Sequence, residues 1–91
     1  MTDLRRLAIG RECQIRLPGC RSEPCCLCHW RQTGISGLGL KSPDVLGAWG
    51  CHWCHEQVDR ISRHDPLVQL DFARGVFRTQ AILIAEGVIR T

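Results

Sequence analysis

The spacing of hydrophobic positions predicts a helix near each end of the chain. Residues 2–9 place leucines on one helical face, begin with capping residue types and are followed by Gly10. Further on, Asp65 supplies a cap and is followed by proline at the first helical position. Apolar residues then recur at steps of three and four, at Leu70, Ala73, Phe77, Ala81 and Ile84. This repeat predicts a long C-terminal helix that ends near Glu86.

Shorter hydrophobic stretches between these helices predict extended segments. Ile15 and Leu17 alternate with polar residues ahead of a Pro18-Gly19 pair, which predicts a strand that folds back at a turn. Residues 25–30 predict a second strand. Residues 44–49 fit either a strand or one helical turn, because so few positions do not fix a period. The sequence therefore predicts a small domain of the α+β class.

The length of the chain limits its hydrophobic core. A chain of 91 residues forms one domain, residues 1–91, and buries only about 60–65% of the surface that its unfolded form exposes. Such a core is marginal and needs a second source of stability. The chain contains seven cysteines, and its N-terminus has no apolar run long enough for a signal peptide. We therefore expect a cytoplasmic protein whose clustered cysteines bind metal. A membrane role has no support, because the longest apolar stretch is far below the roughly 18 residues of a membrane span.

Four cysteines have the pairing expected of a zinc site. Cys13 and Cys20 flank the predicted turn, and Cys51 and Cys54 form a C-x-x-C pair at the start of another predicted helix. Two thiolate pairs suit the tetrahedral coordination of Zn2+, and such an ion contributes on the order of 10 kcal/mol to folding. Two alternatives stay open: some of these thiols are only buried small hydrophobes, or Cys25 replaces Cys20 as a ligand.

The other three cysteines lie on the strand predicted over residues 25–30. Cys26 and Cys28 then share one face of the strand, while Cys25 points to the opposite face. We interpret all three as core-filling side chains.

A histidine and a carboxylate on the helix expected over residues 51–63 form a candidate catalytic centre. His55 and Asp59 are four residues apart, so their side chains project from one helical face. They can share a divalent cation such as Mg2+ and leave positions open for water and phosphate oxygens. His29, on the preceding strand, can act as general base toward the attacking water. Each residue alone fits a structural role equally well, but together they indicate metal-assisted phosphodiester hydrolysis.

The charge of the chain adds little by itself. The formal net charge is +3, from 12 basic and 9 acidic residues, and Lys41 is the only lysine. Arginine favours bidentate contact with phosphate, although a GC-rich genome also favours arginine. The expected DNA contacts are Arg31, Arg60 and Arg63, which lie near the candidate catalytic residues in the sequence.

The motifs resemble those of the HNH, or ββα-metal, endonucleases, many of which carry a treble-clef-like zinc site. The resemblance rests on the order of a Cys-x6-Cys pair, a strand histidine, a glycine-rich loop and a C-x-x-C-H-x3-D motif that begins at Cys51. Segments that begin at Gly10, Arg31, Cys51 and Glu86 are more closely similar to the YbcO-type nucleases of lambdoid prophages. These segments read Gly-Arg-Glu-Cys-Gln-Ile-Arg-Leu-Pro-Gly, Arg-x-Thr-Gly-x-x-Gly-x-Gly-x-Lys-x-Pro-Asp, Cys-x-x-Cys-His-Glu-x-x-Asp-Arg and Glu-Gly-Val-Ile-Arg.

This resemblance implies a small phage or prophage protein, encoded with recombination functions, that binds zinc and cuts DNA. It assigns the structural zinc to the two cysteine pairs named above, and active-site roles to His29 and His55. The three strand cysteines are not part of the shared pattern. Two positions depart from the wider HNH pattern. Cys28 stands where an Asp or His often binds the catalytic metal, and Asp44 is the nearest candidate for the middle asparagine.

The leading hypothesis is a metal-dependent DNA endonuclease, in which Zn2+ holds the fold and His55 and Asp59 bind the catalytic ion. The alternative is a non-catalytic treble-clef zinc module that binds DNA, a recombination protein or a host protein. The apolar stripe of the C-terminal helix fits packing on its own domain or on a second copy, so a homodimer also agrees with the sequence.

Overall fold

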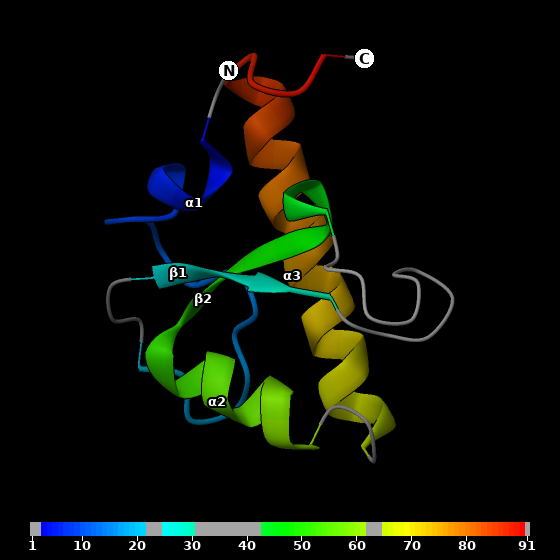
Figure 1. Cartoon of the computed structure of the whole chain (residues 1–91). Helices are drawn as coiled ribbons and strands as arrows, with labels where there is room; N and C mark the ends of the chain where they lie inside the picture. Colours follow the sequence, from blue (N-terminus) through cyan, green and yellow to red (C-terminus); the bar gives the residue numbers. More distant parts are fainter. Residues whose placement is uncertain (1–2, 22–24, 31–42, 62–64, 91) are drawn as a thin grey trace.

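A computed structural model of the chain describes residues 3–21, 25–30, 43–61 and 65–90. In chain order these residues form α1 (Leu4–Leu7), β1 (Cys25–His29), the 3-10 helix η1 (Asp44–Leu46), β2 (Gly47–Cys51), α2 (His52–Ile61) and α3 (Pro66–Ala85). The two strands lie between α1 at one end of the molecule and α2 at the other, and α3 runs along all of them (Figure 1). The described part of the chain therefore has the α+β class predicted from the sequence.

The N-terminal helix is present but shorter than predicted. The Asp3 side chain caps α1 by accepting hydrogen bonds from the backbone N–H groups of Arg5 and Arg6 at 3.0 and 3.4 Å. Gly10 follows with a positive φ of 80°. Arg11 then makes a bidentate ion pair with Glu86, with 2.8 Å between Nη2 and Oε1. This pair ties the segment after α1 to the C-terminal end of α3.

The strand predicted around Ile15 and Leu17 does not form. Arg16 has a positive φ of 57°, so the backbone changes direction in the middle of the alternating segment. One backbone hydrogen bond, from the N–H of Gln14 to the carbonyl of Trp49 at 2.6 Å, still joins this segment to β2. The alternating residues are nevertheless buried, so the pattern correctly indicated burial and wrongly indicated a strand.

The sheet consists of β1 and β2 paired antiparallel, with Cys25 opposite Cys51 and His29 opposite Gly47. The strand over Cys25–His29 confirms the prediction for this segment. The stretch from Asp44 to Trp49, which fitted either a strand or a helical turn, contains both. The single turn η1 leads directly into β2, and β2 is buried along its whole length.

Local sequence signals set the ends of the long helix α3. Asp65 accepts a hydrogen bond from the backbone N–H of Leu67 at 3.0 Å, and Pro66 occupies the first turn. At the other end, Gly87 has a φ of 77°, and the N–H of Val88 reaches the carbonyl of Leu83 at 2.9 Å. This is a Schellman ending, which requires a residue that tolerates positive φ. Both ends of the helix confirm the prediction.

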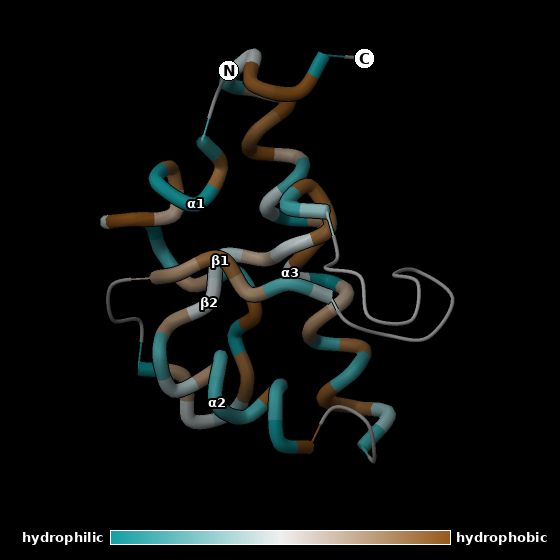
Figure 2. The backbone as a smooth tube through the Cα atoms, in the orientation of Figure 1, coloured by the Kyte–Doolittle hydropathy of each residue, from teal (hydrophilic) through white to brown (hydrophobic). Residues whose placement is uncertain are grey.

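The buried face of α3 differs from the predicted stripe. The helix turns a different set of residues inward: Phe72, Gly75, Val76, Thr79 and Leu83. Members of the predicted stripe are exposed, Phe77 by 68% and Leu70 by 46%. The cause is that α3 carries hydrophobic residues on its exposed face as well as on its buried face. Figure 2 shows hydrophobic segments near its C-terminal end. The exposed row agrees with a homodimer, which stays a prediction.

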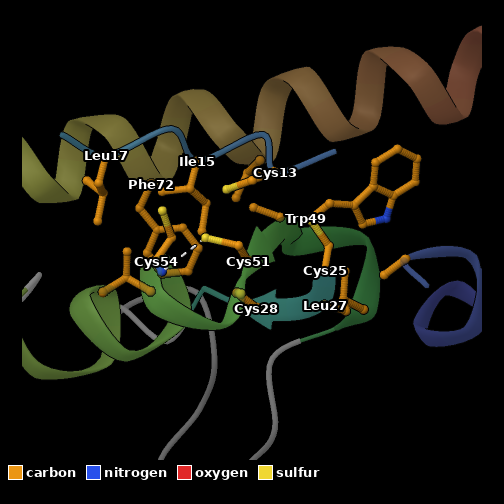
Figure 3. Packing of buried hydrophobic residues seen from close by; sticks show 14 of the residues in the cluster. Cys13, Ile15, Leu17, Cys25, Leu27, Cys28, Trp49, Cys51, Cys54 and Phe72 are labelled. Atoms are coloured by element: carbon orange, nitrogen blue, oxygen red, sulfur yellow. Dashed lines mark hydrogen bonds between the residues drawn. The ribbon is translucent and has the colours of Figure 1, made fainter. Parts of the chain in front are cut away.

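Close backbone contact fixes the rotation of α3 against the rest of the core. A Cβ atom placed on Gly75 would lie 2.9 Å from the Cα of Ile15, so only glycine permits this approach. Thr79 accepts a hydrogen bond from the backbone N–H of Trp49 at 3.0 Å and donates to the carbonyl of Gly75 at 2.8 Å. Ile15 and Phe72 lie close together between α3 and the sheet, and the ring of Trp49 extends away from them toward the C-terminal half of α3 (Figure 3). All three belong to the buried core.

The tryptophans pack against other residues, as the sequence predicted. Trp49 is 1% exposed, Trp30 lies 5.1 Å from Phe72 between ring centroids, and Trp53 covers Gly19. Across the described ranges, none of the helices is both long and apolar enough to span a bilayer.

Candidate metal centres and active site

The four cysteines of the predicted zinc site come together in the structure. Cys13 and Cys20 belong to the segment before β1, Cys51 ends β2 and Cys54 lies in the first turn of α2. Their four sulfur atoms all lie within 4.8 Å of one another. The Cys20 and Cys51 sulfurs are 3.8 Å apart, which is about the edge of a tetrahedron around an ion with the usual Zn–S bond of roughly 2.3 Å. The donor set therefore fits structural zinc, and Cys20 rather than Cys25 completes it.

Local backbone structure prepares each half of this centre. Leu17 accepts a hydrogen bond from the backbone N–H of Cys20 at 2.8 Å. The turn between these two residues uses the positive φ of 93° at Gly19, as the Pro-Gly pair predicted. In the other half, the backbone N–H of Cys54 donates to the Cys51 sulfur at 3.4 Å, drawn as the dashed line in Figure 3. The start of α2 thus turns N–H groups toward sulfur.

These hydrogen bonds make the thiols of the centre unequal. Burial opposes ionisation of Cys51, but backbone N–H groups of Cys54 and Arg21 donate to its sulfur, and its pKa is lowered to about 6. Burial raises the pKa of the Cys54 thiol far above its usual range. Cys51 is thus the more acidic thiol of the two, and Cys54 holds its proton more tightly. Binding a divalent ion to thiolates displaces such protons.

A second group of metal-ligating side chains lies at the junction of β1 and α2. Cys26, Cys28 and His55 have their ligating atoms within 4.8 Å of one another. The Cys26 sulfur is 3.1 Å from Nδ1 of His55. On the other side of the ring, Nε2 of His55 is 3.3 Å from Oδ2 of Asp59. The imidazole ring of His55 therefore contacts a thiol through Nδ1 and a carboxylate through Nε2.

The two thiols of this second group differ in acidity. The hydrogen bond with Cys28 is the main cause that lowers the pKa of Cys26, to about 6, and His55 contributes to the same effect. The pKa of Cys28 is raised strongly, first by its hydrogen bond with Cys26 and then by burial. Cys25, on the other face of the strand, has a pKa raised to about 12 by burial first and by neighbouring thiolates second.

His29 ends β1 in a contact of its own. Its Nε2 is 2.6 Å from Oδ1 of Asp44, the first residue of η1. The hydrogen bond from His29 is the main cause that lowers the pKa of Asp44, and Arg5, with Nε at 3.7 Å, adds to it. Both partners are partly shielded from solvent. The carboxylate therefore orients the imidazole ring.

The sequence of the chain matches a known family along nearly its whole length. The family described as "Putative nuclease YbcO" matches residues 2–88. The chain belongs to the YbcO family. Two YbcO relatives, from Escherichia coli K12 and from Enterobacteria phage 82, are each 42% identical over 98 residues, covering 99% of this chain and 99% of the relative. Both carry the description "Putative nuclease" with the family name.

A solved structure shares the YbcO chain's fold. It is the "Structure of a putative bacteriophage protein" from Escherichia coli K-12, with a TM-score of 0.74 and 34% sequence identity, covering 93% of this chain and 100% of that one.

The structure brings together some of the residues predicted for the YbcO active site. His55 and Asp59 contact each other on α2, as their spacing predicted. His29 contacts Asp44, and among the described residues it belongs to neither metal-ligating group. Alternation along β1 gives its side chain the opposite face from Cys28. The convergence of His29 with the His55–Asp59 pair stays a prediction.

The predicted DNA contacts are only partly within the described residues. Arg60 is exposed near the end of α2, next to Asp59. Arg31 and Arg63 lie outside the described residues, as do residues 33–42 of the glycine-rich loop predicted over residues 33–43.

The interpretation of Cys26 and Cys28 as core filling missed their contact with His55. Both thiols are shielded from solvent, as core residues would be, but they face a metal-ligating nitrogen. The available signal was the C-x-C spacing, which puts two thiols on one strand face next to the helix that follows the paired strand.

Proposed function

We propose that this protein is a metal-dependent endonuclease that hydrolyses phosphodiester bonds in DNA, on an HNH-like ββα-metal fold that zinc holds together. The nuclease description of the YbcO family supports the reaction class. One observation carries the proposal: a β1–β2–α2 unit presents two histidines, each held by a carboxylate, at 2.6 Å in His29–Asp44 and 3.3 Å in His55–Asp59. In a phage or prophage setting the substrate would be DNA undergoing recombination or processing.

His29 is suited to remove a proton from water. With a proton on Nε2 donated to Asp44, the lone pair of the ring is on Nδ1, which is then the basic atom. The contact with the carboxylate fixes the ring and stabilises the imidazolium that forms when Nδ1 takes a proton. We therefore assign His29 the role of general base and Asp44 a positioning role.

His55 and Asp59 are suited to hold the catalytic divalent ion. Their facing atoms, Nε2 and Oδ2, are 3.3 Å apart on a half-exposed face of α2, a separation that one ion can bridge. When bound, such an ion supplies charge neutralisation on the phosphate and on the departing oxygen. The negative charge of Asp59 is a minor cause, after the Cys26 hydrogen bond and burial, of the raised pKa of Cys28. This agrees with an Asp59 carboxylate that lies near Cys28, the residue before His29.

Arginines on the same side would contact the DNA backbone. Arg60 follows Asp59 directly and is exposed, so its guanidinium is free to meet a phosphate. Arg31 and Arg63 are proposed for the same role from their positions in the sequence. Such contacts set the position of the DNA and make binding sensitive to salt.

The test is nicking of supercoiled plasmid by zinc-loaded protein with Mg2+, Mn2+ or Ni2+. Replacing His29 by Ala should lower the rate by about 100-fold or more, because general-base catalysis typically contributes 10²–10⁴-fold. His55→Ala should abolish the metal-dependent part of the rate.

The matched control is His52→Ala. His52 lies on the same helix and contacts Glu56 at the same spacing and at 3.3 Å, but it is exposed and belongs to neither metal-ligating group of the described residues. Its loss should leave nicking unchanged. Equal residual nicking by the wild type and by His29→Ala would refute the endonuclease. Salt-sensitive DNA binding without product under any metal would support the alternative, a non-catalytic zinc module.

A further inference from the structure

The thiols of Cys26 and Cys28 have no role in the zinc centre or in the proposed hydrolysis, although they lie beside His55, which the proposed function assigns to the catalytic ion. We propose that these three side chains form a second metal site, which binds Zn2+ or a similarly thiophilic divalent ion. Two thiols from one strand and one imidazole from the following helix meet there. The inference concerns binding and does not depend on whether the protein cuts DNA.

The geometry suits a tetrahedral ion with small adjustments. The Cys26 sulfur lies 3.1 Å from Nδ1 of His55, and no two ligating atoms of the group are more than 4.8 Å apart. Bond lengths of roughly 2.3 Å to sulfur and 2.1 Å to nitrogen require separations of about 3.5–3.8 Å between ligands. The 3.1 Å contact is only slightly shorter than this range, and the other separations do not exceed 4.8 Å, so small rotations of the side chains suffice.

The ring of His55 is already oriented for this role. Asp59 faces Nε2 at 3.3 Å, which favours the proton on that nitrogen and leaves the lone pair on Nδ1, toward the thiols. A carboxylate on the far nitrogen of a histidine ligand is the usual supporting contact in zinc sites, and its loss weakens metal affinity 10–100-fold. His52, which contacts Glu56 on the same helix, belongs to neither metal-ligating group of the described residues.

The two thiols and the imidazole determine which ion this site prefers, and as three ligands they leave a fourth coordination position open. Thiolates favour Zn2+ and other thiophilic ions over Mg2+, which prefers oxygen. Cys28 is fully buried, while Cys26 and His55 are half-buried, so an ion held by these three residues would be within reach of solvent. Three protein ligands with an open fourth position are typical of exchangeable or catalytic zinc rather than structural zinc.

This site and the proposed Mg2+ site compete for one residue. A neutral imidazole has a single lone pair, so His55 binds metal through Nδ1 or through Nε2, not both. Zinc held by Cys26 and Cys28 would therefore leave Asp59 as a supporting residue.

The test is the zinc content of reduced, metal-loaded protein without DNA, measured by mass spectrometry under non-denaturing conditions. The wild type should hold two ions, and Cys26→Ala, Cys28→Ala and the double variant should each hold one. Cys25→Ala is the matched control, since Cys25 lies on the same strand but in neither metal-ligating group, and it should hold two. Asp59→Asn should keep the second site with affinity lowered 10–100-fold.

Other outcomes would overturn the inference. The inference fails if the wild type binds only one zinc ion, if the double variant still binds two, or if Cys26 and Cys28 form a disulfide under reducing conditions. If alanine at the buried Cys28 prevents folding, Cys26→Ala alone decides the result. A protein that binds two ions but cuts no DNA would refute the proposed function and leave this inference standing.

Discussion

The stability of this protein should increase with the concentration of free Zn2+. The slope of stability against the logarithm of that concentration should be proportional to the number of ions bound. A ligand that binds only the folded state stabilises it by RT ln(1 + [L]/Kd), so above Kd each tenfold change in free Zn2+ changes stability by about 1.4 kcal/mol per ion. Unfolding a chain of 91 residues carries an entropy of about 0.19 kcal/mol/K, from roughly 2.1 cal/mol/K per residue. The expected shift in Tm is therefore about 7 °C per tenfold change for one ion and about 14 °C for two.

The assay is thermal unfolding in chelator buffers that set free Zn2+ over several decades, followed by circular dichroism and by tryptophan fluorescence. Trp49 reports directly on the core, because it is 1% exposed and lies two residues before the zinc ligand Cys51. The double replacement of Cys26 and Cys28 by Ala should halve the slope. Cys54→Ser should abolish cooperative unfolding, since the tetracysteine centre is expected to supply on the order of 10 kcal/mol.

Two results would refute this reasoning. A wild-type Tm independent of free Zn2+ would mean that the four clustered sulfurs are only buried thiols. A wild-type slope retained by Cys54→Ser would mean that zinc is held elsewhere in the chain.

Two further predictions concern the core and the His29 contact. Replacing Gly75 by Ala should destabilise the protein by about 1–3 kcal/mol in urea unfolding, because the new Cβ would lie 2.9 Å from the Cα of Ile15. Arg74→Ala, on the exposed face, is the control, and a Gly75→Ala protein as stable as the wild type would contradict the packing. In NMR titrations, the lowered pKa of Asp44 should rise toward its ordinary value in His29→Ala, because the hydrogen bond from His29 is its main cause. At a pH above the pKa that Asp44 has in the unfolded chain, the contact therefore stabilises the fold. This contribution is lost as the pH falls through the pKa of Asp44 in the folded protein. An unchanged titration midpoint of Asp44 in His29→Ala would exclude the contact with His29.

Elements with strong local signals could be predicted from the sequence. The cap at Asp65 and the positive φ at Gly87 fix both ends of α3 within a few residues, because caps and left-handed turns depend on neighbouring atoms only. The β1 strand and the helix after Cys51 were also predicted from local sequence.

Elements that depend on distant contacts were predicted less well. The alternation of Ile15 and Leu17 indicates burial but not pairing, and the reversed φ at Arg16 prevents a strand there. For α3, two hydrophobic faces compete, and periodicity does not choose between them. The choice depends on the small residue Gly75, which admits the backbone of Ile15.

By itself, the sequence predicted the tetracysteine centre, because two cysteine pairs, each at a turn or helix start, have the spacing of zinc ligands, and the tertiary structure then chose Cys20 over Cys25. It also determined the contact between His55 and Asp59, because four residues make about one helical turn. Only the tertiary structure decided the partners of the remaining functional groups. Asp44 reaches His29, and Cys26 reaches His55, across 15 and 29 residues of sequence. Such contacts arise where β1 meets η1 and α2, and no local pattern specifies which side chains will face each other there.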